Sequence, residues 1–345
     1  MANVPGHPDR YDLQLRRPIR RRRVRFVRRD FTDKDEKEDQ ALITKYHSEM
    51  RLYTCRQELS RLLDDKIFLA NSLAFVSSKI NGGWELPQPL NLNYVGTNER
   101  LTEDEEMQKI KTRISDTRLT FSTDTHTLRS LTRYLISQNL GAGCEEFPEI
   151  DTPNVLFRAF NRRNHTRYDD RFGFRSSRQP FTLPDPQARG LKGSALVTAD
   201  MLRKHCEGRE PSDLIALSDS LPRIFNIISC WDFKDMAGDC IAVMDVSKLI
   251  AAGVLINRTT TLAMDLGVQL RSSSNPEGLP FANPNYWVAY RWVPAECIAF
   301  CTSTSNMRDV CKQNNIGDKD YSTKITLQEL QSSLPLAKLQ DLSLN

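Results

Sequence analysis

The spacing of apolar residues changes at about residue 150, and this change predicts two kinds of structure in one chain. Before that point, apolar residues recur at steps of three and four, which is typical of helices with a buried face. After it, short apolar runs alternate with polar loops, which is typical of a mixed α+β domain with short strands. A length of 345 residues is enough for about two folded parts, each with a core.

Residues 34–149 are expected to form an antiparallel helical module. A first helix is predicted over 36–80, and a second begins at Thr102, where Thr-Glu-Asp-Glu matches a capping box. A polar, Thr-rich break over 115–127 is expected to separate the second helix from a third over 128–140. The apolar positions of the first helix are Leu42, Ile43, Tyr46, Met50, Tyr53, Leu59, Leu62, Leu63 and Ile67. No heptad is sustained long enough to predict a coiled coil.

Residues 150–305 are expected to fold as an α+β domain. Apolar runs predict strands over 155–160, 214–217, 240–244, 286–292 and 297–301. Helical patterns cover 195–206, 220–231, 246–251 and 259–266. The last residues, 306–345, are expected to be a polar tail with a weak helical pattern.

Positive charge is concentrated at the amino terminus. Residues 1–29 hold ten Arg and two Asp, a net charge of +8, so the rest of the chain carries −4. The densest part is Arg20, Arg21, Arg22, Arg23 and Arg25. Like charges repel, so residues 1–33 are expected to be a disordered arm. The arm has two functional interpretations, a nuclear targeting signal or a contact with nucleic acid or another polyanion, and a third in which it is only a solvated tail.

Composition excludes several other classes of protein. No apolar stretch approaches the roughly 18 residues that span a bilayer, so no membrane role is expected. No apolar segment follows the amino-terminal charges as in a secretory signal, which predicts an intracellular protein of the nucleus or cytoplasm. The eight Cys form no C-x-x-C pair, so we expect reduced thiols and no metal site.

One charged residue, Arg158, lies inside the apolar run Val-Leu-Phe-Arg-Ala-Phe. Charged residues are seldom placed in a buried strand unless they are paired or used. Arg158 is therefore expected either to form a structural salt bridge, for example with Asp239 or Asp245, or to hold a phosphate or carboxylate through its guanidinium group.

The order of four segments resembles a fungal domain family of unknown function. The segments are Leu-Phe-Arg-Ala-Phe from residue 156, Leu-Ile-Ala-Leu-Ser-Asp-Ser from 214, Ile-Ala-Val-Met-Asp-Val-Ser-Lys-Leu from 241 and Tyr-Trp-Val-Ala-Tyr-Arg-Trp-Val-Pro-Ala-Glu-Cys-Ile from 286. That family in turn resembles the ADP-ribosyltransferase fold of the heat-labile-enterotoxin type. The resemblance covers residues 150–305 and implies a split β-sheet.

The resemblance implies a set of site residues and NAD as the possible cofactor. Arg158 matches the Arg that holds NAD, and Ser218 and Ser220 match the Ser-x-Ser element that shapes the nicotinamide pocket. The position of the catalytic Glu falls at about Tyr286, which is neutral at pH 7. Glu277, in a nearby loop, is the carboxylate that could replace it.

Three functions follow as hypotheses. The first is a catalytically degenerate ADP-ribosyltransferase-like domain that acts in binding, with a protein partner or a nucleotide-like ligand. The second is an active NAD-dependent transferase that uses Arg158, Ser218, Ser220 and a displaced acid such as Glu277. The third is a nucleic-acid-associated protein that acts through its Arg-rich arm. The sequence predicts no oligomeric state.

Overall fold

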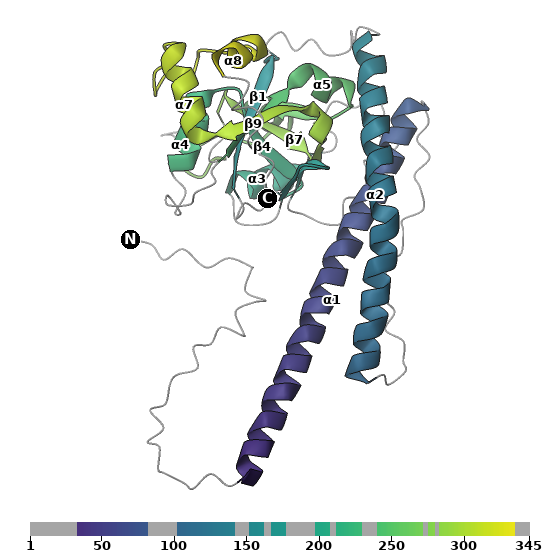
Figure 1. Cartoon of the computed structure of the whole chain (residues 1–345). Helices are drawn as coiled ribbons and strands as arrows, with labels where there is room; N and C mark the ends of the chain where they lie inside the picture. The colour runs from purple at the N-terminus through teal and green to yellow at the C-terminus, as the bar shows by residue number, and fades with distance from the viewer. Residues whose placement is uncertain are drawn as a thin grey trace, which may run out of the picture. The chain divides into compact units, whose positions relative to one another are not determined.

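A computed structural model (Figure 1) describes residues 33–81, 102–141, 152–161, 167–176, 197–207, 212–229, 240–271, 275–279 and 283–334. The chain divides into two compact units, and the division passes through both long helices rather than between residues 149 and 150. Of the described residues, the first unit contains 33–66 and 102–121, and the second contains the others. The predicted arm, with Arg20, Arg21, Arg22, Arg23 and Arg25, lies outside the described residues.

The first unit consists of parts of two helices, α1 (Asp33–Ile80) and α2 (Glu103–Gly141). Their polar contacts join residues whose numbers rise together: Ser48 with Glu103, Arg56 with Glu106, Glu58 with Arg118 and Lys66 with Thr120. The two helices are therefore parallel, as Figure 1 also shows, and the predicted antiparallel arrangement is wrong. The helices are joined through the 22 residues from Asn81 to Thr102, a length that at roughly 70 Å when extended allows a parallel arrangement.

The apolar contact between the two helices involves Leu52, Leu59, Ile110 and Ile114, which are all buried. The apolar residues nearer the start of α1 do not join it. Five of them are exposed: Leu42, Ile43, Tyr46, Met50 and Tyr53. At 100° per residue most of these positions lie on the side of α1 opposite Leu52 and Leu59, which explains why the periodicity did not identify the buried face.

Helix α2 is continuous, and the break expected over 115–127 is absent. Buried positions continue through the Thr-rich stretch at steps of three and four, with Thr117, Phe121 and Thr125 among them. The hydroxyl of Thr117 donates to the carbonyl of Arg113 at 2.7 Å, and Thr132 does the same to Leu128 at 2.8 Å. A buried threonine thus satisfies its hydroxyl within its own helix. The capping box at Thr102 is confirmed by its contacts with Glu105.

The second unit contains a six-stranded antiparallel sheet and a three-stranded one. The larger sheet has the order β6-β7-β4-β1-β5-β9. Its strands are β1 (Val155–Phe160), β4 (Leu214–Ser218), β5 (Cys240–Asp245), β6 (Ile256–Arg258), β7 (Tyr286–Tyr290) and β9 (Ile298–Ser303). The smaller sheet consists of β2 (Arg167–Asp169), β3 (Gly173–Arg175) and β8 (Trp292–Val293). The predicted α+β class is confirmed, and so are four of the five predicted strands. The strand predicted over 286–292 is instead two strands, β7 and β8, which belong to different sheets, and Arg291 between them has a φ of 62°.

Helices cover both faces of the larger sheet, and the predicted helices are confirmed apart from small shifts at their ends. They are α3 (Ala199–Glu207), α4 (Leu221–Ser229), α5 (Val246–Ala251), α6 (Thr259–Asp265), the short 3₁₀ helix η4 (Ala295–Cys297), α7 (Thr304–Gln313) and α8 (Leu327–Ser333). Alternate residues of β1 supply two cores: Leu156 and Phe160 pack with the smaller sheet and α5, and Phe157 packs with α4, α7 and α8.

The carboxy-terminal residues are part of the fold, although a polar tail was predicted from residue 306. Met307, Val310 and Leu330 are buried in the core on the α4 side of the sheet. Thr326 and Glu329 form a capping box at the start of α8, where a weak helical pattern was predicted. Only one face of each short helix is apolar, so the average composition of the segment is polar although it is packed.

Candidate functional site

Three of the five predicted site residues, Arg158, Ser218 and Tyr286, lie on adjacent strands of the larger sheet. Ser218, at the end of β4, is in register with Phe157 of β1 on one side and with Tyr286 of β7 on the other. Strand β1 pairs with β5 along six residues but with β4 at this single position. Ser218 is the last residue of β4, and no register pair joins residues 214–217 to β1, which leaves an opening in the ladder between these two strands.

Arg158 bridges this opening. Its Nη1 donates to the carbonyl oxygen of Ala216 in β4 at 2.5 Å, and its guanidinium carbon lies 5.3 Å from the ring centroid of Phe174. The side chain is 7 % exposed, and its Nε has no hydrogen-bond partner. Burial lowers the pKa of Arg158 to about 10, which still leaves the guanidinium charged at neutral pH.

Asp245, one of the two expected partners of Arg158, does not form a salt bridge with it. That carboxylate accepts from the Ser247 hydroxyl at 2.5 Å and from the Lys248 amide at 3.3 Å, so it caps α5. Asp239 lies outside the described residues. In the part of the chain that the structure describes, no carboxylate pairs with Arg158.

The two serines are fully buried but have different surroundings. The Ser218 hydroxyl donates to the carbonyl of Asn285 at 2.9 Å and accepts from the amide of Ser220 at 3.2 Å. The Ser220 carbonyl accepts from the Ile224 amide, which makes Ser220 the N-cap residue of α4. Its hydroxyl, however, has no hydrogen-bond partner. Ser218 thus ties β4 to the turn before β7, whereas the Ser220 hydroxyl is unused.

Tyr286 is held by a histidine that the sequence did not single out. The Tyr286 hydroxyl lies 3.1 Å from Nε2 of His205 in α3, and the rings are nearly parallel with centroids 6.1 Å apart. The Nδ1 of His205 is 3.1 Å from the hydroxyl of Ser212. Burial, with a contribution from Arg158, lowers the pKa of His205 to about 3, so the imidazole is neutral at neutral pH.

Tyr286 also stays protonated. Burial raises the pKa of its hydroxyl, the nearby Cys206 raises it further, and the positive charges of Arg158 and Arg223 act in the opposite direction. The net pKa lies well above the usual range for tyrosine. The site therefore combines neutral hydrogen-bonding groups with two arginines, one from β1 and one from the first turn of α4.

Asp219, between the two serines, is occupied by structural contacts. One carboxylate oxygen accepts from the Asn285 amide at 2.9 Å and lies 2.8 Å from Nζ of Lys324. The other accepts from Nε1 of Trp287 at 3.1 Å. The Asp219 side chain is 1 % exposed. This carboxylate joins β4, β7 and the segment before α8, and it is not available as a catalytic acid.

Glu277 is not brought to Arg158 or Tyr286. It lies in the exposed turn Asn275–Gly278, beyond the bridge between Leu270 and Leu279. No contact joins Glu277 to Arg158, Ser218 or Tyr286. Ser218 and Tyr286 are therefore in register at the ends of β4 and β7, and Ser220 directly precedes α4. Arg158 lies in the middle of β1 and alternates onto the side of Leu156 and Phe160, and Glu277 is separate.

Sequence reasoning missed His205 and Arg223. Both were inside expected helices, and neither belongs to a motif. His205 is nearly buried in a helix that packs on β4 and β7, which only the three-dimensional arrangement reveals. Arg223 follows Ser220 by three residues, and this position in the first helical turn was the only available signal.

The described residues were also compared with the requirements of metal sites, disulfides and membrane spans. No group of three or more metal-ligating side chains occurs among the residues that could be searched. The six described Cys form no disulfide with one another, and burial raises the pKa of the Cys206 thiol to about 12. No helix in the described ranges is long and apolar enough to cross a membrane.

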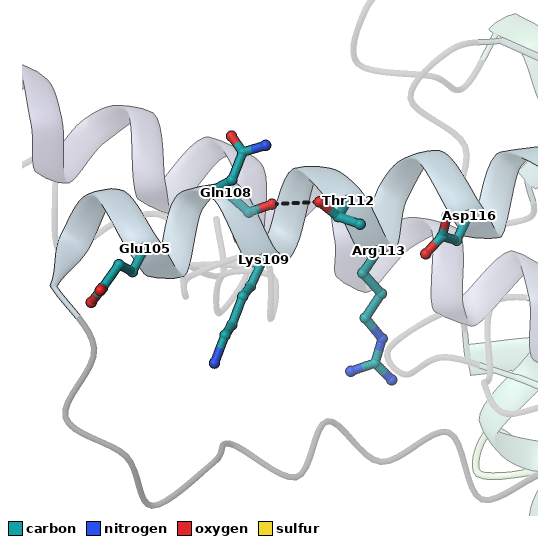
Figure 2. A pocket seen from close by; sticks show the side chains of 6 residues that line it. All are labelled: Glu105, Gln108, Lys109, Thr112, Arg113 and Asp116. Atoms are coloured by element: carbon teal, nitrogen blue, oxygen red, sulfur yellow. Dashed lines mark hydrogen bonds between the residues drawn. The ribbon is translucent and has the colours of Figure 1, made fainter.

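A hollow of about 440 Å³ lies on the first unit, along α2 (Figure 2). It is lined by Glu105, Gln108, Lys109, Thr112, Arg113 and Asp116. Their spacing places them along one side of the helix, and acidic and basic side chains are mixed there. This hollow shares no residue with the site around Arg158.

The comparisons with known proteins identify one domain. Residues 151–307 match a family described as "Domain of unknown function (DUF7587)". This range contains Arg158, Ser218, Ser220, Arg223 and Tyr286. Comparison with curated proteins and with solved structures gives no match.

Proposed function

We propose that the α+β unit is an ADP-ribosyltransferase-like domain that has no transferase chemistry and acts in binding. The observation that carries the proposal is Tyr286. Where the resemblance expects a catalytic carboxylate, this neutral phenol is in register with Ser218 and is hydrogen-bonded to a neutral imidazole.

The charges around Tyr286 oppose the expected reaction. Cleavage of NAD at the nicotinamide bond develops positive charge on the ribose, which a carboxylate stabilises. Here the charged side chains that act on the Tyr286 hydroxyl are Arg158 and Arg223, and both are positive. Positive charges beside a developing cation raise the barrier, so the arrangement is unsuited to transfer.

The same features favour binding. The buried Arg158 guanidinium has a hydrogen-bond donor, Nε, without a partner, and guanidinium groups are well suited to bind an anionic or nucleotide-like ligand. Alternatively, the domain binds a protein partner and serves as a scaffold. The proposed location is the nucleus or cytoplasm, for which the Arg-rich arm is the supporting feature.

The experiment is incubation of the full chain with NAD that carries a label on its adenylate part, followed by detection of labelled protein. We expect no transfer to the chain or to added acceptor proteins. Arg158→Ala serves as the control for contamination. Transfer by the unmodified chain that disappears in Arg158→Ala would show that the domain is an active transferase.

A further inference from the structure

Helix α1 carries a second apolar stripe that its contact with α2 does not use. The stripe lies on the side of α1 opposite Leu52 and Leu59, within an arc of about 100° at 3.6 residues per turn. Its members, all in the first unit, are between 37 and 65 % exposed, and we call them the outer stripe: Leu42, Ile43, Tyr46, Met50 and Tyr53. A surface helix of a globular protein has one apolar side, so a second such side indicates a second contact.

The outer stripe has the spacing of a coiled-coil seam. Four of its members follow one another at steps of three, four and three residues: Ile43, Tyr46, Met50 and Tyr53. This is the alternation of the a and d positions of a heptad, whose side chains insert between those of a facing helix. The Tyr53 hydroxyl accepts from Nε2 of Gln57 at 2.7 Å, so its ring can be covered while its polar atom keeps a partner.

The residues at the two ends of the seam favour one orientation of a partner helix. In the sequence, the two preceding heptad positions are the acidic Glu36 and Asp39, and the two following positions are the neutral Gln57 and Ser60. In a parallel pair in register, each position faces its own copy, so two acidic positions would face their like. In an antiparallel pair centred on residue 48, acidic positions are level with neutral ones. Like charges that face each other are unfavourable, so the antiparallel pair is preferred.

The area of the outer stripe is sufficient for a specific contact. Its exposed fractions are equivalent to about two and a half large side chains, which at roughly 150–250 Å² each expose on the order of 400–600 Å². Two copies facing each other would bury about twice this area, which with the flanking polar atoms reaches the roughly 1,000 Å² that a specific interface requires.

We propose that the first unit pairs with a second copy of the chain through the outer stripes of two antiparallel α1 helices, on the side away from α2. In this arrangement each layer combines a ring with a flexible or aliphatic side chain, because Tyr46 is level with Met50 and Ile43 is level with Tyr53. The pair is twofold symmetric, so one stripe covers the other. The inference goes beyond the function proposed for the α+β unit, since these residues lie outside 151–307.

Sedimentation velocity of the full chain tests the proposal. For an interface of this size we expect a dissociation constant of about 1–100 μM, so the chain changes from monomer to dimer over that range. Ile43→Lys and Met50→Lys each place an unpaired charge in the seam and should raise the dissociation constant by about tenfold or more. Lysine is a good helix former, so circular dichroism should show unchanged helix content. Leu119→Lys, at a 75 % exposed position of α2 in the same unit, is the matched control and should leave the dimer unchanged.

An exchange of charges tests the orientation. Ile43→Glu and Tyr53→Lys should each weaken the dimer. In the antiparallel pair the two introduced charges are opposite in sign and level with each other, so the double variant should recover most of the association. In a parallel pair the double variant would bring like charges face to face and would remain a monomer.

The outcomes separate this inference from the proposed function. A chain that remains a monomer at about 200 μM, twice the upper limit expected, would overturn the pairing and mean that another part of the same chain covers the outer stripe. A dimer that Ile43→Lys and Met50→Lys leave unchanged would overturn it as well, because the copies would then associate elsewhere. Loss of association in the single variants without recovery in the double variant would overturn the antiparallel arrangement. None of these results changes the expected absence of NAD transfer.

Discussion

The hydroxyl of Tyr286 lies 3.1 Å from Nε2 of His205, and both groups are neutral at physiological pH. The pair joins α3 to β7 beside the opening between β1 and β4. It also brings two neutral side chains to the place where the resemblance expects a negative charge. The stability and the chemistry of the site therefore depend on the protonation of these two groups.

His205 should make the protein less stable at low pH. Its pKa is about 3 in the folded state and near 6.5 in the unfolded state, so below about 6.5 the unfolded chain binds the proton first. This contribution is complete above pH 6.5 and falls by at most about 1.4 kcal/mol per pH unit as the pH decreases toward 3. Urea unfolding of the unmodified chain and of His205→Gln at several pH values measures the difference. His126→Gln, at an exposed position of α2, is the matched control substitution.

Asp219 should be a strong structural determinant. Asp219→Ala removes the acceptor of Trp287 and Asn285 and the partner of Lys324, and we expect a loss of about 3 kcal/mol in the free energy of unfolding. Lys324→Ala should cost less, because Lys324 is half exposed. Lys312→Ala breaks an exposed pair with Asp309 and should have almost no effect in the same denaturation measurement. Equal effects of the three substitutions would contradict the account.

Leu330 tests whether the carboxy-terminal helices belong to the core. The side chain is fully buried, so Leu330→Ala should lower the unfolding free energy by about 2–5 kcal/mol. Met264→Ala, at a position 78 % exposed in the same unit, is the control and should change it little. An unchanged melting temperature for Leu330→Ala would restore the interpretation of this segment as a tail.

The parallel arrangement of α1 and α2 can be tested by charge reversal. Arg56 and Glu106 contact each other through two guanidinium nitrogens at 2.6–2.9 Å. Arg56→Glu and Glu106→Arg should each destabilise the first unit, by about 1 kcal/mol at low salt, and the double variant should recover most of that loss. Circular dichroism followed during heating provides the measurement. No recovery in the double variant would mean that the two residues are not neighbours.

The fold was predictable where the pattern is local. The apolar runs of β1, β4 and β5 are short and continuous, and each is a strand as expected. The parallel orientation of α1 and α2 was not predictable, because the pattern within each helix does not determine how two helices with a long connection are oriented. Thr117 and Thr125 suggested a break because threonine disfavours helices, but burial on one face outweighs this propensity.

The part of the site that leaves a local signal in the sequence was also predictable. Arg158 was detectable because a charge inside an apolar run is unusual, and Ser218 and Ser220 were found through the resemblance. His205 and Arg223 approach Tyr286 only after the chain has folded, from two helices separated by β4. Neither the periodicity nor a motif in the sequence predicts that these side chains come close to Tyr286.

The most direct measurement of the central claim is the rate of NAD hydrolysis by the full chain and by Tyr286→Glu. The account predicts no hydrolysis above background by the unmodified chain, since the site has no carboxylate to stabilise the cation. A gain of hydrolysis in Tyr286→Glu would place the missing group at Tyr286. Hydrolysis by the unmodified chain that Arg158→Ala abolishes would contradict the account.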